Sequence, residues 1–317
     1  MRDYILRRLL VLPLVMLGVS FLTFITFRII PGDVVDITCG WQCSEETRQA
    51  IREQYGLDQP LLVQYWDWLK GIPTGDLGHS FRGNLSVSTE LERRMPITIQ
   101  LMIMTVVFSA GLGIPLGIFS AIRPGSIWEK IARFTSILWL SVPVFYSGTL
   151  VIIFGALWFG WVPPQFETGY VSPFEDPITN MEQFLLPALI LAFASAGVII
   201  RVTRSSMLEV MRNDYIRTAW SKGLRERSVV WRHALKNALI PVVTLLGLEA
   251  GGLIGGAVII ESIFGLNGVG VYTVQSVISR ELLVVQALAL IFAFTYVLIN
   301  LAVDILYAWL DPRIRYA

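Results

Sequence analysis

Residues 184–202 read Phe-Leu-Leu-Pro-Ala-Leu-Ile-Leu-Ala-Phe-Ala-Ser-Ala-Gly-Val-Ile-Ile-Arg-Val, an apolar run whose first charged side chain is Arg201. A helix needs about 20 such residues to cross roughly 30 Å of hydrocarbon. This run therefore predicts a transmembrane helix. Other stretches have the same length and character, and the six predicted spans are Leu9–Ile30, Ile97–Ile122, Phe134–Trp161, Phe184–Val202, Ala238–Ile260 and Leu283–Tyr307.

The composition of the whole chain agrees with a protein that lives in a bilayer. Of 317 residues, 54% are hydrophobic and 15% are charged, and the mean hydropathy is +0.62. Soluble domains have about 45–50% apolar and about 25% charged residues. The apolar excess is too large to bury in one soluble core, and the net charge of +1 does not indicate a nucleic-acid partner. We predict an all-α integral membrane protein of six transmembrane helices.

The positions of Lys and Arg predict the orientation of these spans. Nine basic and three acidic residues occupy 201–236, and basic residues also dominate the loop 123–133 and both chain ends. Residues 31–95 instead hold ten acids and six bases, and residues 162–183 hold four acids and no base. Since Lys and Arg are enriched in cytoplasmic loops, both termini are predicted to be cytoplasmic, as an even number of spans requires. The apolar run of the first span is too long for a signal peptide, so it is predicted to remain as an anchor.

The predicted organisation has three parts. Residues 1–30 form the N-terminal tail and the first span, residues 31–95 form an extracytoplasmic α-rich segment, and residues 96–317 form the membrane core with helices 2–6. The core contains a basic cytoplasmic loop at 205–237. In the outer segment, Ser44 followed by two glutamates is typical of a helix start.

Only two cysteines occur in the chain, Cys39 and Cys43, and both fall in the predicted outer segment. Oxidation is possible on that side of a membrane, so we predict a disulfide that closes a small loop after the first span. Two free thiols are the alternative, and a metal site is disfavoured because no histidine is nearby.

The chain lacks the motifs of an enzyme that hydrolyses nucleotides. A phosphate-binding loop requires G-x-x-x-x-G-K-[ST], and none of the four lysines has that context. There is also no HExxH, CxxC or G-x-S-x-G motif. His79 and His233 are predicted on opposite sides of the membrane, so they cannot share a metal. We therefore expect no catalytic residues, no metal and no cofactor bound by this chain.

Glu249 is an acidic residue inside the fifth predicted span. Ionisable groups within spans are usually functional, so we predict that Glu249 lines a translocation path together with Gly252 and Gly256. Pairing of Glu249 with a buried group is the alternative. The glycines of this span are also spaced as in closely packed helices. A stand-alone ion-coupled carrier that uses Glu249 and Asp304 is the alternative function, although no inverted repeat is evident.

The predicted cytoplasmic loop contains two short helices. Residues 213–224 read Asn-Asp-Tyr-Ile-Arg-Thr-Ala-Trp-Ser-Lys-Gly-Leu, and residues 231–241 read Trp-Arg-His-Ala-Leu-Lys-Asn-Ala-Leu-Ile-Pro. Asn213 or Asp214 can cap the first helix, and Gly223 can end it in the left-handed conformation. A short amphipathic helix is suited to docking in a groove of another protein; a basic connector held at anionic headgroups is the alternative. The shared face would carry Ile216, Ala219, Trp220 and Gly223.

This loop resembles the EAA loop of binding-protein-dependent ABC importers, the element that docks onto the ATPase subunits. The chain resembles the permease subunit of the dipeptide/oligopeptide/nickel family of these importers over nearly its whole length. At the positions of the family's Glu and of the residue after it, this chain has Arg217 and Thr218. The strings that carry the resemblance are Tyr4–Leu9, Arg28–Asp33, Tyr55–Leu61, Gly75–Gly78, Gly113–Gly117, Asn300–Asp304 and Asp311–Tyr316.

The resemblance implies a permease subunit that forms half of a pathway for di- or oligopeptides delivered by a solute-binding protein, with nickel chelates or oligosaccharides as alternative substrates. The implied partners are a second homologous permease, two cytoplasmic ATPases that carry ATP and Mg²⁺, the extracytoplasmic solute-binding protein and the lipid bilayer of the inner membrane, with no nucleic acid. Carried onto this chain, the ATPase-coupling residues are Asp214, Tyr215, Arg217, Thr218, Ala219, Lys222, Gly223, His233, Asn237 and Pro241.

Overall fold

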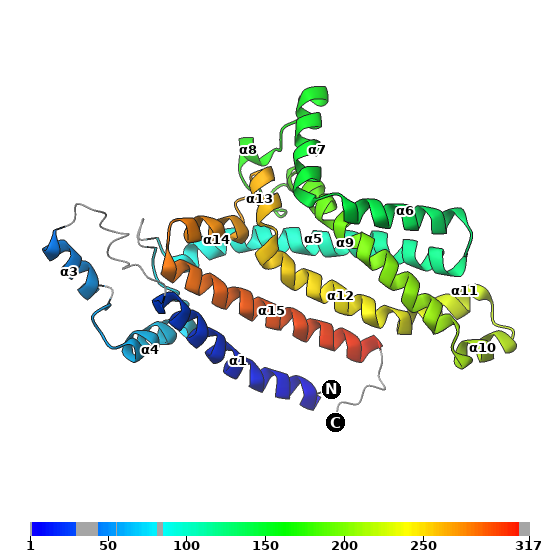
Figure 1. Cartoon of the computed structure of the whole chain (residues 1–317), viewed down its shortest axis with the longest axis horizontal. Helices are drawn as coiled ribbons and strands as arrows, with labels where there is room; N and C mark the ends of the chain where they lie inside the picture. The colour runs from blue at the N-terminus through cyan, green and yellow to red at the C-terminus, as the bar shows by residue number, and fades with distance from the viewer. Residues whose placement is uncertain (1, 30–43, 55, 81–84, 311–317) are drawn as a thin grey trace.

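A computed structural model describes residues 2–29, 44–54, 56–80 and 85–310 of the chain (Figure 1). These residues are almost entirely helical, and within them the only strand-like pairing is an isolated antiparallel bridge between His79 and Ser86. The predicted all-α fold class is therefore confirmed for the described part of the chain. Cys39 and Cys43 lie outside the described residues.

Five long helices form the body of the molecule: α1 (Arg2–Ile29), α5 (Val87–Ile122), α9 (Pro177–Met211), α12 (Leu235–Gly256) and α15 (Leu282–Leu310). They run side by side in Figure 1. α5 packs on α9 and α12, α12 packs on α15, and α15 packs on α1. Within the described residues, four stretches are long and apolar enough to cross a membrane, and α1 contributes a shorter apolar stretch, Leu10–Thr26. The four stretches are Val87–Ile122, Pro177–Met211, Glu226–Ile254 and Leu282–Tyr307.

The predicted third span is broken rather than straight. α6 (Ile127–Ser141) and α7 (Val144–Phe159) meet at 92°. Pro143 explains the break, because proline has no N–H to donate and disfavours the helical conformation in the residue before it. Val142 is accordingly extended, with φ −93° and ψ 119°. α6 follows the bundle, whereas α7 points away from it (Figure 1).

The end of the fifth predicted span also differs from a single straight helix. α12 ends at Gly256, and α13 (Val258–Phe264) begins after Ala257. α13 then turns by 98° into α14 (Val269–Ile278). The turn starts at Gly265, whose left-handed φ of 71° is easily adopted only by glycine. The α13–α14 hairpin lies at the end of the bundle opposite α10 (Figure 1).

Short helices complete the two ends of the bundle. The outer segment contains α3 (Glu45–Gln54), α4 (Leu61–Gly71) and the 3₁₀ turn η1 (Ile72–Thr74). The predicted start of α3 is observed, since Thr47 N–H donates to Ser44 Oγ at 3.2 Å. α8 (Gln165–Thr168) follows α7, and α10 (Asp214–Ser221), α11 (Glu226–Ser228) and the π-helical turn η2 (Val229–Ala234) precede α12.

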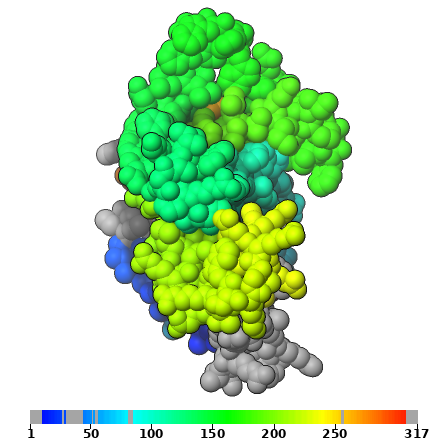
Figure 2. All heavy atoms as spheres, turned by 90° about the vertical axis from the view of Figure 1, so that its right-hand side faces the viewer, coloured from blue at the N-terminus to red at the C-terminus, as the bar shows by residue number. Residues whose placement is uncertain are grey.

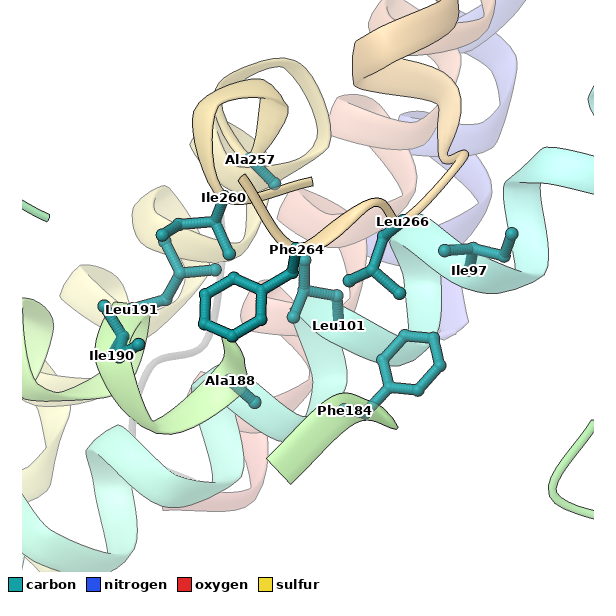
Figure 3. Packing of buried hydrophobic residues seen from close by; sticks show 10 residues of the cluster. All are labelled: Ile97, Leu101, Phe184, Ala188, Ile190, Leu191, Ala257, Ile260, Phe264 and Leu266. Atoms are coloured by element: carbon teal, nitrogen blue, oxygen red, sulfur yellow. The ribbon is translucent and has the colours of Figure 1, made fainter. Parts of the chain in front are cut away.

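The apolar core that supports the hairpin joins three helices. Phe264 is buried, and Figure 3 shows its ring pointing from the hairpin toward Leu101 of α5 and Ala188 of α9. A second cluster at the other end of the bundle packs Ile216 of α10 against residues of α5, α9 and η2. The two clusters hold the hairpin and α10 to the same long helices, α5 and α9.

Candidate functional site

The predicted coupling loop lies at one end of the helical bundle. The start of α1, the turn between α5 and α6, the α10–α11 segment and the end of α15 are all at this end (Figure 1). Figure 2 looks onto it, with the segment near residue 130 (blue-green) above the segment near residues 210–240 (yellow). The segments with the strongest positive charge in the sequence are thus gathered at one end.

The predicted boundaries of α10 are close to the observed ones. Asn213 is the residue before the helix, but it makes no side-chain cap hydrogen bond. Asp214 instead lies in the first turn, where a carboxylate interacts favourably with the helix dipole. Gly223 has φ of 75°, its N–H donates to Trp220 O at 2.9 Å, and it ends the helix as predicted.

One side of α10 anchors the helix to the membrane core. Ile216 is fully buried and Ala219 is 6% exposed. Both belong to the apolar cluster that includes Met207 of α9 and Val230 of η2. Asn237 Nδ2 also donates to Tyr215 Oη at 2.8 Å, which ties the start of α12 to α10. α10 is therefore fixed to the ends of two long helices and should move with them.

The other side of this region presents large side chains to solvent. Trp220 was expected on the same face as Ile216 and Ala219, but it is 43% exposed, because it falls just beyond the buried stripe of the helix. Thr218 and Lys222 are exposed as well, and Arg217 pairs with Asp214 of the same helix at 3.5 Å. The exposed apolar group, as we name it, consists of Tyr215, Trp220, Leu224 and Trp231.

The remaining predicted coupling residues lie where η2 meets α12. His233 is half-buried in η2, and Pro241 is exposed within α12. Proline inside a helix leaves a carbonyl without its usual partner. Among the described residues, neither His233 nor Pro241 makes a hydrogen bond to the exposed apolar group.

Glu249 lies in the middle of α12 with both carboxylate oxygens buried and without a hydrogen-bond partner among the described residues. Gly252, one turn further on, faces open space, because an added Cβ would meet nothing within 4 Å. Gly251 behaves differently: an added Cβ would lie 2.5 Å from Tyr296 Cδ2 of α15. Gly251 therefore belongs to the contact between α12 and α15, whereas Gly252 lies on an open side of α12. Gly256 ends α12, and its surroundings are not described.

A second buried acid, which sequence reasoning missed, organises the α13–α14 hairpin. Glu261 is 0% exposed, and its carboxylate accepts hydrogen bonds from Thr98 Oγ1 at 2.7 Å and Val271 N–H at 3.0 Å. Thr98 Oγ1 in turn accepts from Val269 N–H at 2.9 Å. The carboxylate therefore caps the start of α14 and joins it to α5. The sequence did contain a signal for Glu261, because an acidic residue within an apolar run indicates a specific role.

Replacing Glu261 with Ala is expected to loosen the hairpin. The change leaves the buried Thr98 hydroxyl and the partly buried Val271 N–H without their acceptor, and the loss at a buried group costs about 1–3 kcal/mol. We expect a clear drop in thermal stability and faster amide hydrogen exchange over residues 266–278. Glu182→Ala is the control, because Glu182 is an exposed carboxylate at the same end. Equal exchange in both variants would contradict the capping role.

Two family descriptions match the chain and together cover nearly all of it. Residues 113–316 match the family described as binding-protein-dependent transport system inner membrane component. Residues 1–102 match the N-terminal family of the same membrane components.

Known proteins show the same relationship over the full length. A putative peptide transport system permease protein of Brucella abortus is 41% identical over 316 residues, which cover 100% of both chains. An oligopeptide transport system permease protein of Bacillus subtilis is 38% identical, and a glutathione transport system permease protein of Salmonella choleraesuis is 36% identical, again over 100% of both chains. Among solved structures, an inward-facing methionine ABC transporter shares the fold, with a TM-score of 0.54, 18% identity and coverage of 70% of this chain and 96% of the other.

Proposed function

The chain belongs to the binding-protein-dependent transport system inner membrane components, the multi-pass permease subunits of ABC importers, and on this basis we propose that it forms half of an inner-membrane pathway for di- or oligopeptides. The substrate class is supported by relatives named as peptide, oligopeptide and glutathione permeases, which match this chain from end to end. Nickel chelates and oligosaccharides are the competing substrates.

The proposed topology has six spans with both termini in the cytoplasm. The spans are α1, α5, the broken pair α6–α7, α9, α12 and α15, and the α13–α14 hairpin is a re-entrant element on the outer side. The grouping of the basic segments at one end of the bundle supports this orientation. The proposed parts are residues 1–30, the outer segment 31–95, and the permease core 96–317, which includes the coupling loop 205–237.

The proposed role of α10 is to dock onto an ATPase subunit. Two such subunits would hold ATP and Mg²⁺, a second homologous permease would complete the pathway, and a solute-binding protein would deliver the peptide outside. When ATP closes the ATPase pair, α10 would be displaced as a rigid body. Because α10 is packed on α9 and η2, this motion would reach the long helices and switch the pathway between outward- and inward-open states.

The observation that carries this proposal is the two-sided construction of α10. Ile216 and Ala219 anchor it inside the permease, while Trp220 of the exposed apolar group remains 43% exposed beside them. An aromatic side chain that is solvent-exposed on a rigidly held helix is typical of an interface anchor. The proposed translocation path includes Glu249, Gly252 and Gly256. It is supported by the Glu249 carboxylate, which is buried without a hydrogen-bond partner among the described residues, and by the open space at Gly252.

Co-purification tests the docking. Trp220→Ala is expected to reduce the amount of ATPase recovered with the permease at least about tenfold, because interface anchors of this kind are worth about 2 kcal/mol or more. Trp66→Ala is the matched control, since Trp66 is 55% exposed on α4 at the other end. The docking proposal fails if no ATPase ever co-purifies, or if both variants retain it equally. Transport by this chain alone under an ion gradient would instead favour the carrier that uses Glu249 and Asp304.

A further inference from the structure

A cavity of about 300 Å³ lies at the α10 end of the bundle, apart from the exposed apolar group. It is lined from three helices, with Ser120 from α5, Glu129 and Arg133 from α6, and Arg201 and Arg204 from α9. The sequence predicted no binding role for any of these residues, and the proposed coupling mechanism does not use them.

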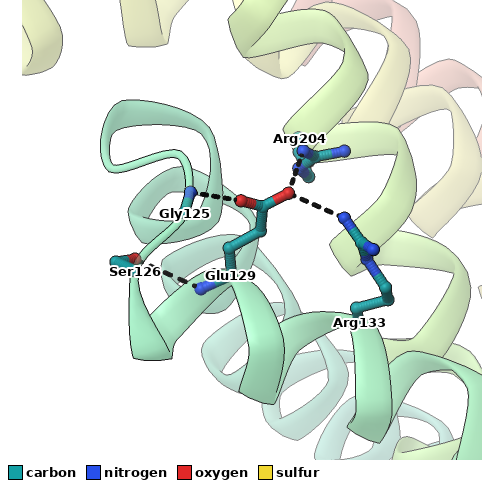
Figure 4. Close-up of polar contacts among 5 residues, drawn as sticks. All are labelled: Gly125, Ser126, Glu129, Arg133 and Arg204. Atoms are coloured by element: carbon teal, nitrogen blue, oxygen red, sulfur yellow. Dashed lines mark hydrogen bonds and ion pairs between the residues drawn. The ribbon is translucent and has the colours of Figure 1, made fainter.

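The charges around the cavity do not cancel. The Glu129 carboxylate accepts hydrogen bonds from Arg133 Nη2 at 2.9 Å, Arg204 Nη2 at 2.6 Å and Gly125 N–H at 2.6 Å (Figure 4). One glutamate thus faces three arginines, Arg133, Arg201 and Arg204, in the lining. The cavity carries an excess of positive charge, and the Glu129 network fixes the positions of two of the guanidinium groups.

Buried polar atoms in the lining lack partners. Ser120 is 1% exposed, and its hydroxyl makes no hydrogen bond to any described residue. Arg204 Nε is likewise buried and without a partner among the described residues. A buried donor without an acceptor costs about 1–3 kcal/mol. A ligand with several negatively charged oxygens would satisfy both donors and the excess charge.

The surface beside the cavity is apolar. Along α6, Phe134 is 67% exposed, Ile137 is 60% exposed and Leu138 is 43% exposed, and Ile137 also lines the cavity. These side chains follow Arg133 along α6, toward the middle of the proposed span. A soluble anion would use only the arginines, whereas a phospholipid would use both surfaces. Basic pockets between membrane helices on the cytoplasmic side are typical sites for anionic headgroups.

We propose that this cavity binds the phosphate headgroup of an anionic phospholipid of the cytoplasmic leaflet, with its acyl chains along Phe134 and Ile137 of α6. The Arg201 and Arg133 side chains would contact the phosphate oxygens from the rim, and Ser120 and Arg204 would donate from within. Glu129 acts as a positioning residue for Arg133 and Arg204. The site is independent of which solute the permease carries.

The test measures retained lipid on the transporter purified as a complex. Mixed micelles would contain phosphatidylglycerol and phosphatidylcholine with the same acyl chains, and native mass spectrometry would count each bound lipid. The wild-type complex is expected to retain phosphatidylglycerol preferentially. Arg133→Gln and Arg201→Gln should each weaken that retention roughly fivefold, the equivalent of about 1 kcal/mol per basic residue at a membrane surface. Both side chains are exposed, so folding should be preserved.

The controls separate the two possible sources of phosphate and exclude a general charge effect. Arg123→Gln should leave retention unchanged, because Arg123 is an exposed arginine of the same end that does not line the cavity. Inorganic phosphate in large excess should not displace the lipid. Displacement by inorganic phosphate, or equal loss in the Arg123 and Arg201 variants, would overturn the proposal. Equal retention of phosphatidylcholine and phosphatidylglycerol by the wild-type complex would overturn it too.

Discussion

Gly117→Val in α5 is expected to prevent accumulation of a stable transporter. A Cβ at this position would lie 2.5 Å from Thr203 Cβ and 2.9 Å from the Ile200 carbonyl oxygen of α9. A backbone oxygen cannot move aside without separating the two helices. Overpacking a tight contact costs about 1–3 kcal/mol and sometimes more, and we expect the upper end of that range here. Size-exclusion profiles and thermal unfolding in detergent would measure the loss.

The same helix provides a control for this prediction. Gly111 also lies in α5, but an added Cβ there would meet nothing within 4 Å. Gly111→Val should therefore behave like the wild type or slightly better, because valine has a higher helix propensity than glycine. If the two variants are equally stable, the α5–α9 contact at Gly113 and Gly117 is not what holds the core together.

Hydropathy predicted the long apolar helices, because a bilayer imposes a simple requirement on length and apolarity; four of them are long and apolar enough to cross a membrane in the described residues. It did not predict the break at Pro143. Pro13, Pro115, Pro187 and Pro241 all lie inside intact helices of the same protein. A proline is tolerated in a membrane helix when neighbouring groups satisfy the freed backbone. Those neighbours belong to the tertiary structure, so the sequence does not tell which proline breaks its helix.

The two buried acids show a similar limit for the candidate site. Glu249 stood out because it falls in the middle of a predicted span, whereas Glu261 falls just after the predicted end of the same span. The partner that gives Glu261 its role, Thr98, is 163 residues away along the chain. A pattern over nearby residues cannot reveal such a pair.

The faces of α10 illustrate a third limit. The amphipathic pattern indicated a helix with one apolar face, and the burial of Ile216 and Ala219 agrees with it. Successive residues of a helix are about 100° apart. Trp220 therefore falls at the border of the apolar face, and only packing decides on which side it lies. The pattern thus predicted the helix but not which apolar residues it leaves for a partner.

Gly223→Val is expected to uncouple ATP hydrolysis from transport while leaving the membrane core intact. Gly223 has φ of 75°, a conformation that costs an L-residue about 1–2 kcal/mol and a β-branched residue more. The strain should re-route the chain after α10 and displace Trp220 and Leu224. We expect stimulation of the ATPase by the loaded solute-binding protein to fall about tenfold, in line with that energy. The membrane core should keep its thermal stability, because the strained turn is exposed and lies outside the long helices, and an added Cβ at Gly223 meets nothing within 4 Å.

Gly223→Asn is the informative comparison for this prediction. Asparagine adopts the left-handed conformation far more readily than valine, so the Asn variant keeps the backbone turn while adding a polar side chain at the same point. If Gly223 matters because it ends α10, the Asn variant should remain coupled and the Val variant should not. If the ATPase must approach the bare backbone, both variants should be uncoupled. Full coupling in both would mean that the end of α10 does not transmit the ATPase motion, and docking would have to be sought at another part of the 205–237 loop.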